Sequence, residues 1–110
     1  MTQLETDMDK VGLYVKFRTQ PGQRDALVKI LLQAAQQAQD ASGCELYVVN
    51  TAPGEEDVVW VTEIWRSAAD HEDALSAPGA TELIGQAIPL LAGPPERIDL
   101  RPAGGAGLRG

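Results

Sequence analysis

The sequence is poor in the residues that most often mark a metal site or a disulfide framework. Its 110 residues include one cysteine, Cys44, and one histidine, His71. Neither an intrachain disulfide nor a structural zinc site therefore has enough ligands, and we expect no metal. Cys44 is interpreted as a small buried residue at the start of a strand. The sequence motifs of nucleotide-binding loops, serine hydrolases and paired metal histidines are also absent, which disfavours those classes.

Long hydrophobic runs and clusters of positive charge are also absent. The longest apolar runs, such as Val58–Val61, are far shorter than the roughly 20 residues that a membrane-spanning helix needs. The segment Met1–Lys10 is acidic and has no apolar stretch of the kind a secretory signal requires. The formal net charge of −7 repels phosphate backbones. We therefore expect a soluble, cytoplasmic protein that binds neither membrane nor nucleic acid.

What is present is typical of one small globular domain. The hydrophobic fraction of 44% and the charged fraction of 23% are ordinary for a folded chain. We predict a domain over residues 11–102, a flexible N-terminal segment over 1–10 and a flexible C-terminal tail over 103–110. The tail consists almost entirely of Gly, Ala, Pro and Arg, which offer little apolar surface with which to order it.

Hydrophobic periodicity predicts alternating strands and helices along this domain. The first strand shows the pattern most clearly, because Val11, Leu13, Val15 and Phe17 all fall on one of its faces. In the third strand both faces are largely apolar, so both must be covered. The predicted strands are Val11–Arg18, Cys44–Asn50, Val58–Arg66 and Arg97–Arg101, with a turn-rich acidic loop over Thr51–Asp57; the predicted helices are Gly22–Ala41, Ser67–Ser76 and Ala80–Leu91.

This order of elements predicts an α+β, ferredoxin-like fold, in which helices cover one face of a four-stranded antiparallel sheet. The other face would expose Tyr14, Tyr47, Val49 and either Trp60 or Trp65, a larger apolar patch than monomers usually tolerate. We therefore predict that a second copy of the chain covers this face, which gives a homodimeric α+β barrel.

Several aromatic and polar residues come near one another in the deduced fold and are candidates for a pocket between sheet and helices. His71 is the only side chain that titrates near neutrality without perturbation. It lies in the acidic stretch Asp70–Asp73, however, so a solvated surface role is equally open, and the tryptophans are also readily explained as core residues. The candidates are Tyr14, Tyr47, Asn50, Trp60, Glu63, Trp65 and His71.

The segment Val58–Ser67 resembles the antibiotic biosynthesis monooxygenase family, and within it the small quinol monooxygenases. The step Trp65-Arg66-Ser67 into a helix is the most specific feature, and Asp70-His71, Leu83-Ile84, Pro89-Leu90 and Gly93 continue the likeness. The resemblance covers about Val11 to Pro102. It implies a dimeric α+β barrel that oxidises a quinol or another hydroxylated aromatic to a quinone with molecular oxygen as co-substrate and no cofactor.

The resemblance also implies roles for two residues. Trp65 matches a tryptophan that lines the pocket of polyketide-oxidising members, and His71 stands where those members carry a tyrosine, so it is the candidate base or proton donor. Tyr14, Tyr47, Asn50, Trp60 and Glu63 are the candidate substrate-binding residues.

Other positions depart from the family pattern. Val61 stands where polyketide-oxidising members have an asparagine, and Ile84 or Gly85 where they have an arginine, so the same substrate is not implied. The residues of haem-degrading relatives are also missing, which disfavours haem degradation. Because fold does not fix function, a non-catalytic dimeric barrel that binds a small hydrophobic ligand as a carrier or sensor is the alternative.

Overall fold

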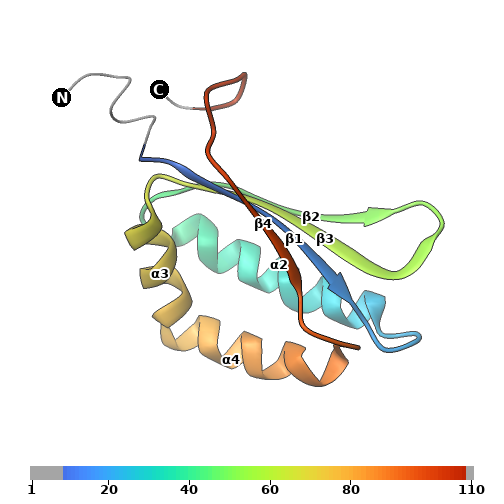
Figure 1. The fold of residues 1–110 in the computed structure, drawn as a ribbon. Helices are drawn as coiled ribbons and strands as arrows, with labels where there is room; N and C mark the ends of the chain where they lie inside the picture. The colour runs from blue at the N-terminus through green and yellow to red at the C-terminus, as the bar shows by residue number, and fades with distance from the viewer. Residues whose placement is uncertain (1–8, 109–110) are drawn as a thin grey trace.

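The structure, a computed structural model, describes residues 9–108, which form a four-stranded antiparallel sheet with helices on one face (Figure 1). In chain order the elements are β1 (Val11–Arg18), α2 (Arg24–Asp40), β2 (Cys44–Ala52), β3 (Glu55–Trp65), α3 (Ala68–Ser76), α4 (Pro78–Ala87), the short 3-10 helix η1 (Ile88–Leu90) and β4 (Glu96–Leu100). The strand order is β2-β3-β1-β4, so β1 and β3 are central. The predicted ferredoxin-like α+β fold is confirmed.

The sequence explains why α2 lies flat on the sheet. Leu27, Leu31 and Ala38 fall on one side of the helix and are buried, while its other side carries polar residues. Two glycines with positive φ bracket the helix: Gly22 has φ 80° and Gly43 has φ 91°. That conformation is open to glycine at no steric cost. The chain can therefore turn sharply into β2 after the helix.

The connection between β2 and β3 is tighter than predicted. Ala52 pairs with Glu55, so only Pro53 and Gly54 separate the strands, and Gly54 has φ 84°. The prediction of a loop over Thr51–Asp57 is therefore wrong, because a Pro-Gly turn lets the acidic residues join the hairpin ladder. The indole N–H of Trp60 donates to Glu55 at 3.3 Å, which anchors the start of β3.

The helices after β3 begin where local chemistry favours them. The side chain of Ser67 accepts a hydrogen bond from the backbone N–H of Asp70 at 3.2 Å, which makes Ser67 the N-cap of α3. α4 begins at Pro78, two residues before the predicted start, because proline suits the first helical turn, where its missing N–H is not needed. Pro89 lies in η1, where the regular helix has already ended.

The two faces of the sheet have different environments. Val59, Val61, Glu63 and Trp65 of β3 point toward the helices and are buried. The hydrophobic core forms around this face. Its buried members are Leu13, Val15, Leu27, Leu31, Val59 and Val61.

The opposite face, called the open face here, carries the alternate residues of each strand. Tyr14, Val48, Ile98 and Leu100 are exposed there, and cross-strand pairing places Trp60 on the same face. The prediction that Tyr47 and Val49 lie on the open face is wrong. Their partners are Glu63 and Val61, so both point toward the helices.

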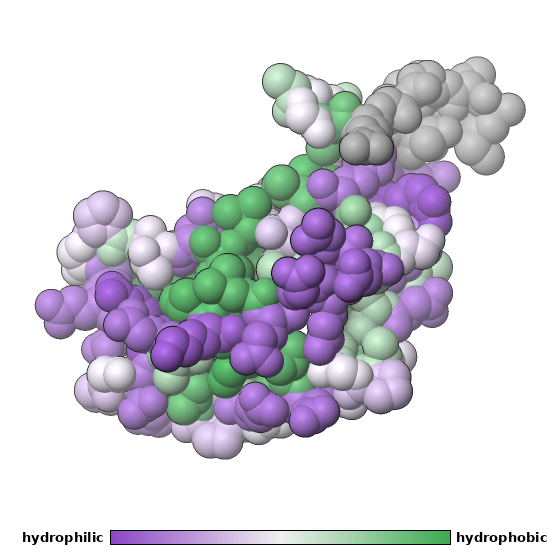
Figure 2. All heavy atoms as spheres, turned by 180° about the vertical axis from the view of Figure 1, so that it is seen from behind, coloured by the Kyte–Doolittle hydropathy of each residue, from purple (hydrophilic) through white to green (hydrophobic). Residues whose placement is uncertain are grey.

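Hydrophobic residues also remain at the surface. From behind, they form a band across the middle of the molecule, with hydrophilic residues on either side (Figure 2). Within residues 9–108, no helix is long and apolar enough to cross a membrane. Of the predicted terminal segments, 1–8 and 109–110 lie outside the described residues. Lys10 is buried and its ammonium group contacts the Glu45 carboxylate, whereas residues 103–107 are exposed.

Candidate functional site

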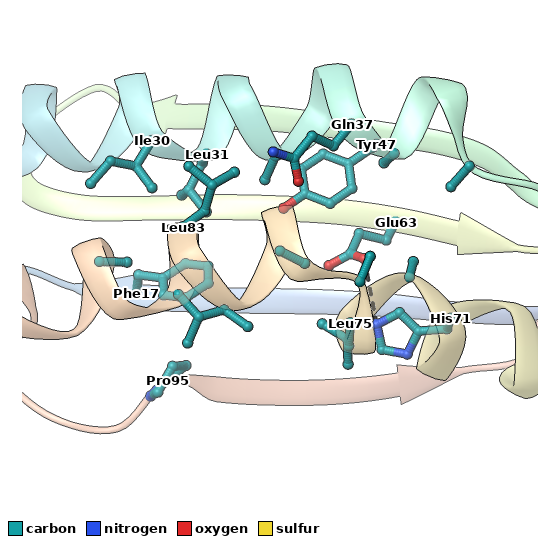
Figure 3. A pocket seen from close by; sticks show the side chains of 18 of the residues that line it. Phe17, Ile30, Leu31, Gln37, Tyr47, Glu63, His71, Leu75, Leu83 and Pro95 are labelled. Atoms are coloured by element: carbon teal, nitrogen blue, oxygen red, sulfur yellow. Dashed lines mark ion pairs between the residues drawn. The ribbon is translucent and has the colours of Figure 1, made fainter.

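A cavity of about 420 Å³ lies between the helix-covered face of the sheet and helices α2, α3 and α4 (Figure 3). Most of the side chains around it are alanine, leucine, isoleucine or aromatic. The polar side chains among the described lining residues are few: Gln37, Tyr47, Glu63 and His71, together with the indole of Trp65. A mostly apolar cavity with a few convergent polar groups is the usual form of a small-molecule site.

Glu63 and Trp65 enter this cavity because they are two residues apart on β3 and therefore point to the same side of the sheet. Trp65 is 2% exposed and Glu63 is 9% exposed. The indole Nε1–H of Trp65 donates to Oε1 of Glu63 at 2.9 Å. This hydrogen bond fixes both side chains and provides a partner for a carboxyl group that is costly to bury alone.

His71 reaches the same place from α3. Its Nε2 lies 3.7 Å from Oε1 of Glu63, and its ring centroid lies 5.4 Å from that of Trp65 with 52° between the planes. The side chain is buried, and Figure 3 shows it pointing toward Glu63 across the cavity end. The reading of His71 as a solvated surface residue is therefore wrong: although its neighbours Glu72 and Asp73 are exposed, the first turn of α3 directs position 71 inward.

Burial shifts the pKa values of both titratable groups toward their uncharged forms. Loss of solvent raises the pKa of the Glu63 carboxyl group, and this outweighs the hydrogen bond from Trp65 and the charge of Arg97, which lower it. Loss of solvent lowers the pKa of His71, and Arg97 lowers it further, whereas Glu72 and Asp99 raise it. The 3.7 Å contact with Glu63 is therefore an ion pair only when His71 is protonated and Glu63 is ionised.

His71 also lines a second cavity, whose lining includes more charged side chains. This cavity of about 330 Å³ lies on the side of α3 that faces β1 and β4. Its lining includes Glu72, Arg97 and Asp99, the charged groups that act on the pKa of His71. The imidazole thus lies between the apolar cavity, where it faces Glu63, and a cavity that charged groups line.

Tyr47 and Gln37 complete the polar end of the apolar cavity. Tyr47 pairs with Glu63 across β2 and β3, and burial together with the charges of Glu63 and Cys44 raises the pKa of its hydroxyl group. Tyr47 therefore stays protonated and can donate a hydrogen bond. Gln37 lies at the junction of α2 with α4, close to Gly79. The sequence did not indicate Gln37, because it belongs to the polar residues of an amphipathic helix.

The structure separates the candidate residues into two groups. Tyr47, Glu63, Trp65 and His71 meet in the apolar cavity. Tyr14, Trp60 and Asn50 lie instead on the open face. There Tyr14 and Trp60 stack with ring centroids 5.2 Å apart.

Asn50 is held by the neighbouring strand on the open face. Its amide donates to the carbonyl of Trp60 at 3.3 Å. The sheet therefore stands between these three residues and the cavity. Within residues 9–108, no group of three or more His, Cys, Asp and Glu residues is placed to hold a metal ion.

Comparison with known proteins gives consistent matches. Residues 11–85 match the model of the family described as antibiotic biosynthesis monooxygenase. The solved structure of a protein from Chloroflexus aurantiacus, named as a putative antibiotic biosynthesis monooxygenase, is 40% identical. The match covers 87% of this chain and 95% of that one, with a TM-score of 0.80. A comparison with curated proteins found no match.

More distant structures share the fold. A protein from Caulobacter crescentus, also named as a putative antibiotic biosynthesis monooxygenase, is 20% identical, with coverage of 89% and 93% and a TM-score of 0.80. A protein of unknown function from Nitrosomonas europaea is 24% identical, with coverage of 94% and 99% and a TM-score of 0.78. At these identities the likeness shows the fold alone.

Proposed function

This chain belongs to the antibiotic biosynthesis monooxygenase family, and from that premise we propose that it oxidises a small quinol or other hydroxylated aromatic to a quinone with molecular oxygen. The observation that carries the proposal is the cluster of Glu63, Trp65 and His71 at one end of an apolar cavity. Such a cavity excludes water from an aromatic ring while presenting it with a base.

In the proposed reaction His71 accepts the proton of the substrate hydroxyl group. Its lowered pKa keeps the imidazole neutral near pH 7, which is the form that can accept a proton. Oε1 of Glu63 lies 3.7 Å from Nε2 of His71, so an ionised Glu63 stabilises the imidazolium that forms when His71 takes up the proton. The hydrogen bond from Trp65 holds Glu63 in place for this role.

The aromatic anion then reacts with oxygen. It passes one electron to O₂, and the resulting radical pair combines into a peroxide at a ring carbon that bears a hydrogen and is ortho to the hydroxyl group. Protonation by His71 and loss of the hydrogen on that carbon break the O–O bond. One oxygen atom stays as the quinone carbonyl, and the other leaves as water with the two hydrogens that came from the substrate. The substrate supplies all the electrons, so the reaction needs no cofactor.

Trp65 forms one wall of the site in this proposal. Its indole N–H is occupied by Glu63, so the ring itself remains available for contact with a flat aromatic substrate. Tyr47 has a protonated hydroxyl group on the same side of the sheet and can donate a hydrogen bond to a second substrate oxygen.

An oxygen electrode tests the proposed activity. Protein freed of flavin and metal is mixed with a panel of one-ring and two-ring hydroquinones, and oxygen consumption is compared with heat-denatured protein to correct for autoxidation. We expect consumption above this background with at least one hydroquinone. Binding of the aromatics with no consumption by any of them would favour the carrier or sensor function instead.

We also propose that the protein acts as a homodimer in which the open faces of two copies meet. Tyr14, Val48, Ile98 and Leu100 are exposed on this face, and a single layer of helices leaves it uncovered. Light scattering should give twice the chain mass of 11.7 kDa. Ile98→Asp should shift the protein toward a folded monomer, whereas Leu32→Asp on α2, equally exposed, should leave the dimer intact.

A further inference from the structure

The apolar cavity is elongated and follows β3. Phe17 pairs with Val59, and Glu63 lies four residues further along the same strand. At about 3.3 Å per residue this separation is roughly 13 Å. Both Phe17 and Glu63 line the cavity, and Figure 3 shows them toward opposite ends of it. The cavity of about 420 Å³ is nearly three times the roughly 150 Å³ that holds one benzene molecule.

Polarity is confined to one end of this cavity. Gln37, Tyr47, Glu63 and His71 lie toward the end of β3, where α2 finishes and α3 begins. The other end is formed by the last residues of β1, by η1 and by the start of β4. Among the described residues that line this far end, every side chain is apolar: Phe17, Ile30, Ile88, Leu91 and Pro95.

The far end also opens to the surface. Ile88 is 61% exposed although it lines the cavity, and Pro95 is exposed as well. Aliphatic side chains at an open end suit a flexible chain, which can follow a curved exit, better than a third rigid ring. The volume left over by a one-ring or two-ring head group is therefore available to such a chain.

On this basis, and resting on the proposed function, we infer that the substrate is amphiphilic: a hydroxylated one-ring or two-ring aromatic that carries an alkyl or prenyl chain opposite its reacting hydroxyl group. The hydroxyl group lies at Glu63 and His71, and the chain runs past Phe17 to Ile88. Each methylene buried in the apolar end strengthens binding up to about fourfold, from about 0.8 kcal/mol per methylene.

Equilibrium dialysis under anaerobic conditions tests this inference without turnover. The probes are 4-methyl-, 4-propyl- and 4-pentyl-1-naphthol, in which the hydroxyl group and the chain lie at opposite ends of the ring system. We expect the dissociation constant of the wild-type protein to fall about tenfold for each two added carbons. A dissociation constant that does not fall with chain length, or no binding of any probe, overturns the inference. So does tighter binding of the three-ring 1-anthrol than of the pentyl compound.

A matched pair of variants tests where the alkyl chain binds. Ile88→Asn should remove most of the gain in affinity that the propyl and pentyl groups give. The dissociation constant of the methyl compound should stay within about threefold of the wild-type value. Leu32→Asn, a similarly exposed position outside the cavity lining, should behave as wild type. Equal weakening of all three probes by Ile88→Asn contradicts the assignment. Binding that strengthens with alkyl-chain length but no oxygen consumption would refute the proposed function alone. Oxygen consumption with binding that does not depend on alkyl-chain length would refute this inference alone.

Discussion

Replacing Glu63 by glutamine tests whether the carboxylate supports His71 during proton transfer. The substitution keeps an oxygen that can accept the Trp65 hydrogen bond and removes the negative charge 3.7 Å from Nε2 of His71. With an effective dielectric constant of about 20, Coulomb's law gives about 4.5 kcal/mol for that pair of charges. If half of this stabilisation is realised in the transition state, kcat/KM falls about 50-fold.

The assay is initial oxygen consumption at pH 7 with the best hydroquinone of the panel. His71→Ala sets the scale, because loss of a general base costs about 10²- to 10⁴-fold. Asp73→Asn on the exposed side of α3 is the control and should retain the wild-type rate. A Glu63→Gln variant with the wild-type rate would show that the carboxylate does not assist His71. A His71→Ala variant with the wild-type rate would move the role of base to Glu63, whose carboxylate form can also accept a proton.

The pH dependence gives an independent test of the same reasoning. The neutral imidazole is the active form, so the rate should rise with pH through a midpoint below 6.5, since burial lowers the pKa of His71. Arg97→Gln removes a positive charge that lowers this pKa and should raise the midpoint. Glu72→Gln removes a negative charge that raises the pKa and should lower the midpoint. A midpoint that neither substitution moves would contradict titration of His71.

Three further predictions concern stability. Trp65→Phe should lower the free energy of unfolding in urea by about 2–4 kcal/mol, because it leaves a cavity and removes the hydrogen bond to Glu63; a loss under 0.5 kcal/mol would contradict the packing described. The contribution of His71 to the free energy of unfolding should fall as the pH drops from about 6.5 through its lowered folded-state pKa, because the unfolded chain then binds the proton more readily. His71→Gln should reduce this slope, and an unchanged slope would exclude His71 as its source. Deletion after Pro102 should change the melting temperature by less than about 2 °C, because residues 103–107 are exposed; a large drop would show that the tail docks.

Much of the fold could be predicted because most elements carry clear local signals. β1 alternates strictly, α2 has a helical apolar side, and Ser67 precedes a helix that it caps. The Pro78-Gly79 pair predicts a break before the helix, whereas the structure uses the proline to begin α4. Local rules thus predicted which elements form better than the residue at which each one begins.

The positions of two site residues follow from a single strand. Glu63 and Trp65 are two apart on β3, so their shared face follows from the period of a strand. β2 has no such signal, because Leu46 to Val49 are all apolar and either phase satisfies the pattern. The pairing with β3 decides the phase: Tyr47 lies opposite Glu63 and points into the cavity, whereas Asn50 lies opposite Trp60 and points away from it.

Oxygen-isotope labelling tests the central claim most directly. The protein, free of flavin and metal, is given its best hydroxylated aromatic under ¹⁸O₂, and the quinone is analysed by mass spectrometry alongside the His71→Ala variant. We predict one ¹⁸O atom in the quinone, the other in water, and a rate for His71→Ala lower by about 10²- to 10⁴-fold. An unlabelled quinone with hydrogen peroxide as the second product, or labelling at equal rates in both proteins, would contradict a monooxygenase that works through this cavity.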